Sequence, residues 1–368
     1  MRPDVACDRR VALLTLAPPA TAVGGVETFT TSLQRALGAV DVIALDEQDG
    51  GIAFLKAARL LGLSEPARAL MVARKFLRLH RRERYACAIC NGMTAWLFAI
   101  RRLSIPVVCV FHGNYAGYVR AVTAPRSFAR FRGLLWSQFE RLAAFAADKV
   151  VAVSPSVENE VRTYYGRPSV TIPNSPDEGT FRPGPAAAAR EALALDHCGD
   201  VALFVGRPTH AKGFDVVEAL AAALPGTLFV CAVTDDVPVA RPNIRLYRRP
   251  SPATLRLLYQ AASYVVAPSR FEGCSYVPLE ALACGTPVIT SPSGLFRCGS
   301  DVDGVHVVRD GADPAAYVEV IERLDDAGRP AATLPDALRF AAFRHAYLGL
   351  VNEVTRSQIA MEATPCGI

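Results

Sequence analysis

Short β-rich runs alternate with helical stretches along the whole chain, and this alternation limits the possible folds more than any other feature. The pattern is typical of βαβ units, which build a parallel sheet covered by helices. One predicted long helix carries six apolar side chains on one face, namely Phe128, Phe131, Leu135, Phe139, Leu142 and Phe145. The predicted strands fall at residues 11–16, 40–44, 85–90, 106–111, 149–153 and 169–172, then at 201–205, 227–233, 244–246, 264–267, 287–290 and 305–308. The predicted fold class is therefore α/β.

The two series of runs predict two domains. A chain of 368 residues is too long for one ordinary hydrophobic core, and residues 173–185 between the series are rich in Pro, Gly and polar side chains. We expect one Rossmann-like, doubly wound parallel-sheet domain over 1–180, a second over 181–335, and a C-terminal helix over 336–368 that packs back on the first. The domains are expected to face each other across a cleft, with ligands beyond the carboxyl ends of the strands.

Composition argues against several other classes of protein. The chain is 51% hydrophobic and 20% charged without a low-complexity tract, which disfavours disorder, collagen and coiled coil. No apolar run approaches the roughly 18 residues of a membrane helix. Residues 9–22 have the layout of a short secretory signal, but Pro18-Pro19 interrupts its apolar core, and a first buried strand is the simpler interpretation. The ten cysteines have irregular spacings and several fall in predicted strands, so we expect a reducing, cytoplasmic location.

Positive charge is concentrated in the first half of the chain. Residues 1–185 hold 24 Lys or Arg against 15 Asp or Glu, whereas the rest of the chain is net negative. Nine of these basic residues lie at 56–84, interleaved with apolar residues at near-helical spacing. Two interpretations stay open, a peripheral contact with an anionic membrane or acidic partner, and ordinary helices with a solvated face. Nucleic acid is not an expected partner, because the segment lacks a recognised nucleic-acid-binding motif.

A pair of glycines follows the first predicted strand. Gly24 and Gly25 precede a helical pattern at 26–37. Glycine lets a ligand approach the backbone closely, and the free amides of a helix start favour an anion such as a diphosphate. A plain turn would explain the pair equally well. The GxGxxG fingerprint is absent, which argues against an NAD enzyme.

The loop after the seventh predicted strand places two cations between a buried strand and a helix. It begins with Gly206 and Arg207 and ends with Lys212 and Gly213. Arg207 can form a forked contact with a diphosphate, and Lys212 can act as a mobile point charge. The alternative is a solvated turn. Because the lysine precedes the second glycine, the loop does not match the P-loop of an NTPase.

Two glutamates lie in segment 269–289 in different surroundings. Glu272 lies in a loop after a predicted strand, whereas Glu280 lies inside a helix that Gly285 ends as a C-terminal cap. A glutamate flanked by Leu279 and Ala281 needs hydrogen-bond donors when it is buried, and a nucleotide ribose supplies two hydroxyls. The pattern therefore indicates ligand binding.

These motifs resemble those of the GT-B fold retaining glycosyltransferases of family 4, also called the glycosyltransferase group 1 family. The resemblance covers nearly the whole chain and includes His112 in Phe-His-Gly and Asn174 in Ile-Pro-Asn. It implies transfer of a sugar from a UDP- or GDP-linked nucleotide-sugar donor to the hydroxyl of a lipid, glycan or small-molecule acceptor. No cofactor is implied.

The resemblance also implies roles for individual residues. Arg207 and Lys212 are expected to hold the donor diphosphate, Glu272 and the amides after it the sugar, and Glu280 the ribose. The implied catalytic residues are His112, Arg207, Lys212 and Glu272. The implied donor-binding residues are Gly24, Gly25, Asn174, Gly206, Gly273, Cys274, Ser275 and Glu280. Cys274-Ser275 stands where the family usually has Phe-Gly, which leaves the donor sugar open.

The implied chemistry needs no metal. Fixed cations stabilise the charge that develops on a leaving nucleoside diphosphate, and with retention the acceptor proton can pass to the departing phosphate. Asp301-Val302-Asp303 matches the DxD pattern of metal-dependent glycosyltransferases, but it precedes Gly304 as a turn would. Two alternatives remain, a GT-B sugar-nucleotide epimerase and a non-catalytic sugar-nucleotide-binding protein.

Overall fold

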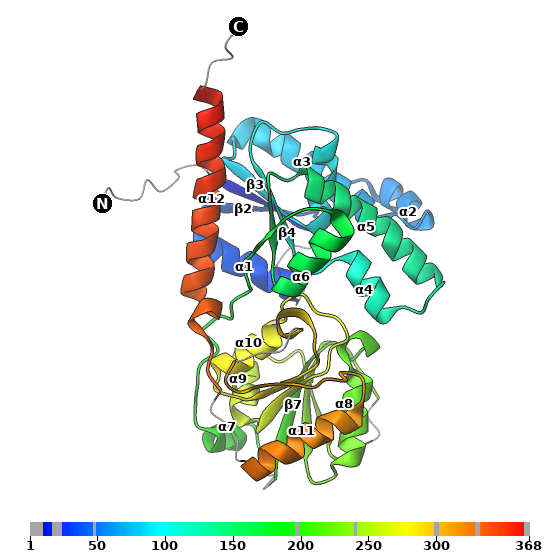
Figure 1. Cartoon of the computed structure of the whole chain (residues 1–368), viewed down its shortest axis with the longest axis vertical. Helices are drawn as coiled ribbons and strands as arrows, with labels where there is room; N and C mark the ends of the chain where they lie inside the picture. Colours follow the sequence, from blue (N-terminus) through cyan, green and yellow to red (C-terminus); the bar gives the residue numbers. More distant parts are fainter. Residues whose placement is uncertain are drawn as a thin grey trace, which may run out of the picture. The chain divides into compact units, whose positions relative to one another are not determined.

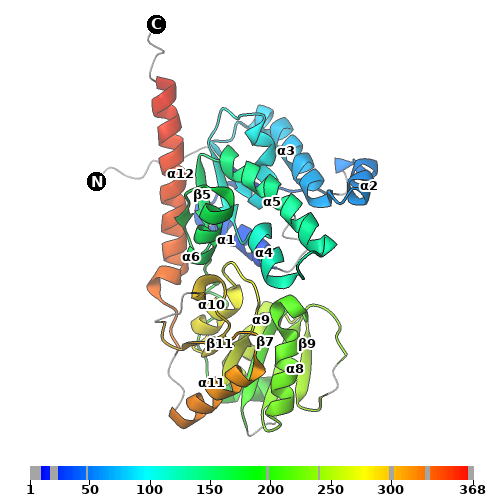
Figure 2. The same cartoon turned by 45° about the vertical axis from the view of Figure 1, so that its right-hand side comes forward.

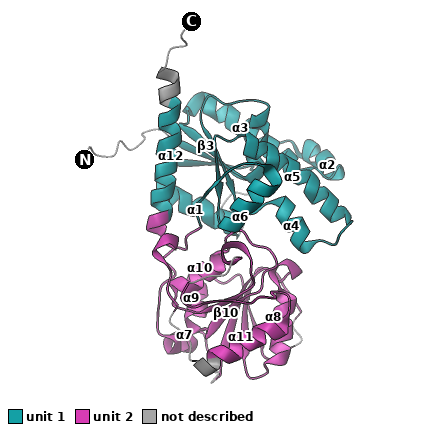
Figure 3. Ribbon diagram, viewed as in Figure 1, with its two compact units in different colours: residues 1–173, 343–368 teal, residues 174–342 magenta. Residues whose placement is uncertain are grey.

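The chain divides into two compact α/β units (Figure 1). The computed structural model describes residues 10–16, 24–46, 49–195, 199–238, 241–297, 302–327 and 332–363. Unit 1 comprises residues 1–173 and 343–368, and unit 2 comprises residues 174–342 (Figure 3). Both divisions lie within seven residues of the predicted boundaries.

Unit 1 contains a six-stranded sheet in the order β2-β1-β3-β4-β5-β6. All neighbouring strands run parallel, for instance β1 and β3 with Val11 opposite Cys87. The strands are β1 (Val11–Leu14), β2 (Val40–Ile43), β3 (Cys87–Asn91), β4 (Val107–Phe111), β5 (Lys149–Ala152) and β6 (Val170–Thr171). The helices are α1 (Gly25–Leu37), α2 (Ile52–Leu60), α3 (Ser64–Glu83), η2 (Gly92–Ala99), α4 (Tyr115–Val122), α5 (Phe128–Ala146), α6 (Pro155–Glu160), η3 (Val161–Tyr165) and α12 (Phe340–Ala363).

Unit 2 repeats this architecture with a second parallel sheet, in the order β12-β11-β10-β7-β8-β9. The strands are β7 (Val201–Gly206), β8 (Leu228–Val233), β9 (Ile244–Arg248), β10 (Tyr264–Ala267), β11 (Val288–Thr290) and β12 (Val305–Val307). The helices are α7 (Ala186–Ala192), η4 (His210–Lys212), α8 (Phe214–Ala223), α9 (Pro252–Ala261), α10 (Tyr276–Ala283), η5 (Gly294–Phe296), α11 (Pro314–Ala327) and η6 (Asp336–Leu338). All twelve predicted strands are confirmed.

The core of unit 2 joins its sheet to α8 and α11. Phe204 of β7 and Phe214 of α8 are buried with their rings 5.5 Å apart, and Tyr317 of α11 is buried in the same cluster. Burying a large apolar side chain contributes roughly 1.5–3 kcal/mol. This core fixes the strands whose ends carry the predicted site.

Several helices begin where a polar side chain caps the first turn. Ser154 accepts a hydrogen bond from the Val157 amide at 3.3 Å, and Pro155 occupies the first helical position. Asn114 accepts from the Gly117 amide at 2.7 Å at the start of α4. These caps satisfy amides that would otherwise lack partners, so they set where each helix begins.

The C-terminal helix α12 packs on α1 and β5 within unit 1. Tyr347 meets the Phe29 ring of α1 with centroids 5.7 Å apart. Lys149 at the start of β5 pairs with Glu353 at 2.6 Å. The end of the chain thus returns to the first sheet.

Helix α5 carries its apolar stripe on the exposed side. Of the six apolar residues predicted to share one face, Phe139 is partly buried against Trp96, with ring centroids 5.2 Å apart, and the other five are exposed. The buried face consists instead of small or polar residues, namely Gly133, Ser137, Glu140, Ala143 and Ala144. Gly133 is required there, because a Cβ would lie 2.2 Å from the Val119 side chain of α4. Close approach of α4 therefore decides which face points inward.

Candidate functional site

Two loops at the carboxyl ends of neighbouring strands carry the charged residues of the predicted donor site. β7 and β10 pair in parallel, so the loops that follow them lie side by side. Lys212 in the first loop and Glu272 in the second form an ion pair, with 2.5 Å between Nζ and Oε1. Both side chains are mostly shielded from solvent. The structure thus joins two residues that the sequence predicted separately.

Arg270 ties the same two loops together and was not predicted. Its guanidinium makes two parallel hydrogen bonds of 2.8 Å to Asp215 of α8, and its amide donates to the Ala211 carbonyl at 2.9 Å. Burial alone would raise the pKa of Asp215, but hydrogen bonds and charge from Arg270 lower it below its ordinary value. Forked pairs of this kind fix geometry as well as charge. No sequence motif distinguishes Arg270 from any other loop arginine.

Two glycines let these loops approach each other closely. Gly213 has a φ of +72°, and a Cβ there would lie 2.1 Å from the Pro268 carbonyl oxygen. Gly294 has a φ of +56°, and its Cβ would lie 2.8 Å from the Gly273 carbonyl oxygen. A larger residue at either position would displace the Glu272 loop, so both glycines support the site.

The linker asparagine contacts the loop that carries Glu272. Asn174 Nδ2 donates to the Cys274 carbonyl at 2.8 Å, while Asn174 Oδ1 is buried without a partner among the described residues. Burial raises the pKa of Cys274 to about 12, so its thiol stays protonated at neutral pH. Beside this contact, a cavity of about 10 Å³ is lined by residues that include Glu272 and Ser275.

Glu280 is buried on α10 and keeps one oxygen available. Its Oε2 accepts a hydrogen bond from the Tyr259 hydroxyl at 2.8 Å, and the described part of the chain offers no donor to Oε1. Burial raises the pKa of Glu280 to about 7, although the Tyr259 hydrogen bond opposes that shift. Such a carboxylate gains stability when a ligand supplies hydroxyl donors.

Arg207 is the first residue after β7, at the start of the loop that follows this strand. It is exposed, and within the described ranges its side chain has no hydrogen bond or ion pair. Gly206 before it has a φ of +150°, a conformation that favours glycine. The structure leaves Arg207 without a protein anion, unlike Lys212.

His112 follows β4 in unit 1 and packs against α1. Its ring lies 4.4 Å from that of Phe29, and its Nε2 is 3.1 Å from Oδ1 of Asn91 at the end of β3. Because Oδ1 only accepts, Nε2 carries the proton in this arrangement. Burial lowers the pKa of His112 to about 4, so the imidazole is neutral at pH 7. Its Nδ1 is buried without a partner in the part of the chain described here. Gly24 and Gly25, at the start of α1, lie one turn before Phe29.

Two buried glutamates hold the residues that follow His112. Glu140 of α5 accepts hydrogen bonds from the Tyr115 amide at 2.8 Å and from the Tyr165 hydroxyl. Asn114 donates to Glu160 at 2.6 Å. Burial raises the pKa of Glu140 to about 7. The sequence analysis missed this network. The only signal was that Glu140 shares a helix face with small residues.

The Asp-Val-Asp pattern, which could alternatively bind a metal, is only partly covered by the described residues. Asp301 lies outside the described residues, so the Asp301-Val302-Asp303 pattern has no geometry to report. Among the residues that the structure describes, no three His, Cys, Asp or Glu side chains are grouped as metal ligands.

Comparison with known proteins agrees with the two-unit division. The family model "Glycosyltransferase Family 4" matches residues 23–178, and "Glycosyl transferases group 1" matches residues 199–326. A D-inositol 3-phosphate glycosyltransferase of Segniliparus rotundus is 31% identical over 273 residues, which is 65% of this chain and 59% of that protein. One from Thermobispora bispora is 35% identical over 282 residues, which is 68% of this chain and 64% of that protein. The chain thus spans less than two thirds of these relatives.

Solved structures show the same fold at lower sequence identity. Sucrose-phosphate synthase of Thermosynechococcus elongatus has a TM-score of 0.78 and 20% identity, covering 95% of this chain and 100% of that chain. The Anabaena protein HepE in complex with UDP-glucose has a TM-score of 0.70 and 16% identity, covering 94% and 100%. These likenesses confirm the predicted GT-B fold. With both family models matched in their respective units, the chain belongs to glycosyltransferase family 4, the group 1 glycosyltransferases.

Proposed function

We propose that this protein is a retaining glycosyltransferase that moves a sugar from a nucleoside-diphosphate sugar to a hydroxyl acceptor. The observation that carries the proposal is the Lys212–Glu272 pair at the ends of β7 and β10. It supports the proposal because Lys212 can bind a diphosphate and Glu272 can accept hydrogen bonds from sugar hydroxyls, and Arg270 ties their two loops together. The family membership and the names of the relatives support the same conclusion.

Donor binding exchanges the ion pair for contacts with the ligand. Lys212 turns to the diphosphate and Glu272 accepts hydrogen bonds from sugar hydroxyls, so the separated charges each gain a new partner. Arg207, which has no protein anion to release among the described residues, adds a forked contact to the same phosphates. Glu280 accepts the ribose hydroxyls through its available oxygen, supported by Tyr259.

The chemical step needs fixed positive charge more than a base. The bond between the anomeric carbon and the phosphate oxygen breaks, and the nucleoside diphosphate leaves with developing negative charge. Arg207 and Lys212 stabilise that charge without a metal. The acceptor oxygen bonds to the anomeric carbon on the same face, and its proton passes to the departing phosphate. His112 is neutral, so it serves as a hydrogen-bonding group near the sugar.

We propose a UDP- or GDP-sugar as the donor, and the HepE structure with UDP-glucose supports the UDP-linked alternative. The acceptor is the hydroxyl of a lipid, a glycan or a small molecule. We propose a cytoplasmic location, which the buried free thiols Cys87, Cys90, Cys109, Cys231, Cys274 and Cys284 support, because reducing conditions keep such thiols free.

The proposal is tested by incubating the protein with a panel of UDP- and GDP-sugars without acceptor and analysing products by mass spectrometry. A transferase releases free sugar and nucleoside diphosphate slowly, and a candidate acceptor accelerates that release. Appearance of an epimeric nucleotide sugar would establish an epimerase instead. Binding with no product, and no response to any acceptor of the panel, would establish a binding protein.

A further inference from the structure

Within the described ranges, exposed large apolar side chains are confined to unit 1. Twelve are exposed among the residues that the structure describes, and all twelve belong to unit 1. Contiguous exposed apolar surface of this kind marks an interaction site. Seven of the twelve define what we call the apolar patch: Ile52, Phe54, Leu60, Leu61, Phe128, Phe131 and Leu135.

Helix α2 supplies the first half of the apolar patch. Its sequence is IAFLKAARL, yet Ala58 is the only residue of this helix that is buried. Leu60 at its end is 89% exposed, and Leu61 in the following turn is 74% exposed. A helix this apolar, exposed on most of its surface, is typical of segments that lie in a membrane interface.

The exposed stripe of α5 supplies the second half and lies next to the first. Trp136 Nε1 of α5 donates to the Gly62 carbonyl at 2.7 Å, immediately after Leu61. Arg132 contacts Gly62 and lies over the Trp136 ring at 5.2 Å. Phe128 and Phe131, in the turn before Arg132, are 72% and 66% exposed. Figure 1 and Figure 2 both show α2 near α5, and the Trp136–Gly62 hydrogen bond joins the end of the α2 segment to α5.

The surroundings of the apolar patch are strongly positive. Residues 52–82 contain eight Lys or Arg and one acidic residue, Glu65, while residues 115–147 contain five Arg and one acidic residue, Glu140. Glu140 is buried, and Glu65 pairs with Arg68 at 3.5 Å. A second copy of this chain would bring like charges together, whereas an anionic surface would meet complementary charge.

A cavity of about 400 Å³ opens beside α2, with charged and apolar walls. It is lined by Arg74, Arg78, Arg81 and Arg101 together with apolar residues that include Phe54, Met71 and Leu77. Such a lining suits the phosphate and the first carbons of a phospholipid headgroup. Because Phe54 belongs to the apolar patch as well, cavity and patch are continuous.

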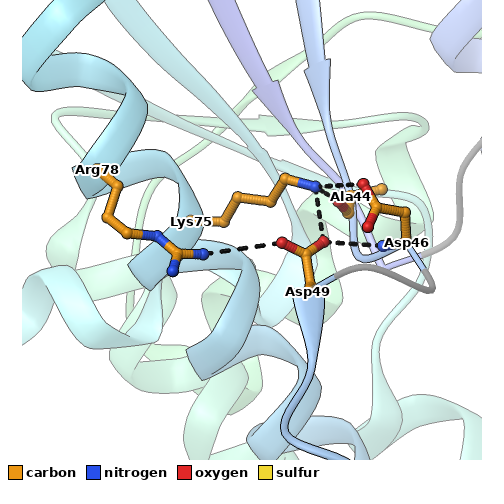
Figure 4. Close-up of polar contacts among 5 residues, drawn as sticks. All are labelled: Ala44, Asp46, Asp49, Lys75 and Arg78. Atoms are coloured by element: carbon orange, nitrogen blue, oxygen red, sulfur yellow. Dashed lines mark hydrogen bonds and ion pairs between the residues drawn. The ribbon is translucent and has the colours of Figure 1, made fainter.

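Asp49, which lines this cavity, is already paired with basic side chains. Asp49 accepts from Lys75 at 2.6 Å and lies 3.7 Å from Arg78, as Figure 4 shows. Lys75 also reaches Asp46 at 2.8 Å. Burial alone would lower the pKa of Lys75, but hydrogen bonds and charge from Asp46 and Asp49 raise it above its ordinary value. In the described part of the chain, Arg74, Arg81 and Arg101 have no counter-charge.

We propose that this face of unit 1 docks on an anionic phospholipid bilayer, with the apolar patch in the acyl boundary and the cavity arginines on lipid phosphates. This places the docking surface differently from the sequence prediction, which used 56–84 alone. Within that segment, α3 turns Val72, Ala73 and Phe76 into the core, so the apolar contacts come from α2 and α5. No described helix is long and apolar enough to cross a bilayer, so the contact is peripheral.

Vesicle co-sedimentation tests this proposal with the full chain. Wild-type protein is expected to bind phosphatidylcholine vesicles that contain about one third phosphatidylglycerol, and to be released as salt rises. Arg74→Gln with Arg81→Gln should lower the partition coefficient roughly 25-fold, about fivefold per cation. Arg241→Gln with Arg309→Gln in unit 2 removes the same charge and should change it little.

The apolar half is tested with Leu61→Ser and Phe131→Ser together, against Val170→Ser, an exposed apolar residue outside the apolar patch. The patch variant should lose vesicle binding at least tenfold and keep its unfolding temperature, because both side chains are exposed. Three outcomes overturn the proposal: no binding at low salt, equal binding by patch and control variants, or a wild-type dimer that the patch variant converts to monomer.

Discussion

The two units share one architecture and differ in the side chains that their strand-end loops and exposed helix faces carry. Unit 2 keeps its ion pairs at the strand ends, where Lys212–Glu272 and Arg270–Asp215 are partly open to solvent. Unit 1 buries Glu140 and Glu160 beneath the loop after β4 and exposes aromatic and aliphatic side chains instead. Within one fold, function therefore depends on what the loops and helix faces carry, and not on the sheet itself.

The difference has a physical meaning for each unit. An ion pair can open when a charged ligand offers each of its members a new partner, which suits a donor that must enter and leave. Buried carboxylates with several hydrogen bonds resist rearrangement, which suits a loop that must hold His112 still. We expect unit 2 to respond to ligands and unit 1 to respond to surfaces, while each unit holds a buried glutamate whose pKa is raised to about 7.

The largest expected effect is the contribution of Glu140 to the pH dependence of stability. Its pKa is raised to about 7 in the folded chain, so the folded state holds a proton where the unfolded state has lost it. Stability from this group is present at low pH and is lost as pH rises from about 4.5 to 7. The unfolding free energy of wild type minus that of Glu140→Gln should therefore fall by about 3 kcal/mol between pH 4.5 and pH 7.

The test compares the unfolding free energies of two proteins, because His112 changes stability with pH in the opposite direction to Glu140. Its pKa is lowered to about 4 by burial, so its contribution grows as pH rises from about 4 to 6.5. Urea unfolding of wild type and Glu140→Gln at several pH values cancels the His112 contribution. If the difference in unfolding free energy between the two proteins stays constant with pH, the pKa of Glu140 is not raised by burial. The buried carboxyl beneath the loop after β4 would then no longer distinguish unit 1 from unit 2.

Removing the cations of unit 2 is expected to slow donor cleavage by one to two decades or more. Arg207→Ala and Lys212→Ala each lose about one charged hydrogen bond to the leaving group, worth roughly 1.5–3 kcal/mol. Initial rates of nucleoside diphosphate release measure this, with Arg309→Ala as a matched exposed cation outside the site. If Lys212→Ala cleaves donor as fast as wild type, the strand-end pair is structural only.

Substitutions of Glu280 and Glu272 in unit 2 should have different effects on nucleotide affinity and on turnover. Glu280→Gln is expected to weaken binding of the bare nucleoside diphosphate by roughly 1–3 kcal/mol, because a charged acceptor to two hydroxyls is lost. Glu272→Gln should not weaken that affinity, because it releases Lys212 from its ion pair, and it should impair turnover, since Glu272 contacts the sugar. Isothermal titration calorimetry separates the two, and equal losses of affinity in both variants would refute the division of roles.

The smallest expected effect is that of metal chelation. Donor cleavage should persist in excess EDTA, because Arg207 and Lys212 supply the positive charge at the leaving group. The measurement is the cleavage rate before and after dialysis against EDTA. If activity is completely lost and Mn²⁺ or Mg²⁺ restores it, the protein depends on a metal. Asp301 and Asp303 would then be the first candidates for its ligands.

The sequence predicted the strands well and the helix faces poorly. β-rich runs separated by turn residues identify strands locally, so all twelve were found. Periodicity showed that Phe128 and Phe131 share a face of α5 but could not show that this face points outward, because that depends on α4 approaching Gly133. Which side of a helix is buried is a tertiary property.

The donor site was predicted one residue at a time and not as an assembly. Lys212 and Glu272 stood out because of their neighbours in sequence, yet the pairing of β7 with β10 is what joins them. Arg270 carried no local signal, and the Glu140 network showed only that Glu140 shares a helix face with small residues, since their partners lie far away along the chain. Groups that position other groups are therefore the ones that sequence reasoning misses.

Hydrogen–deuterium exchange with and without UDP or GDP can locate the bound nucleoside diphosphate. We expect it to bind at the strand ends of unit 2 and not in the arginine-lined cavity of unit 1, although both attract phosphate. We predict protection of peptides covering 206–213 and 268–280, with exchange in 74–82 and 101 unchanged. Binding accompanied by protection of 74–82 and no protection of 206–213 would contradict the account.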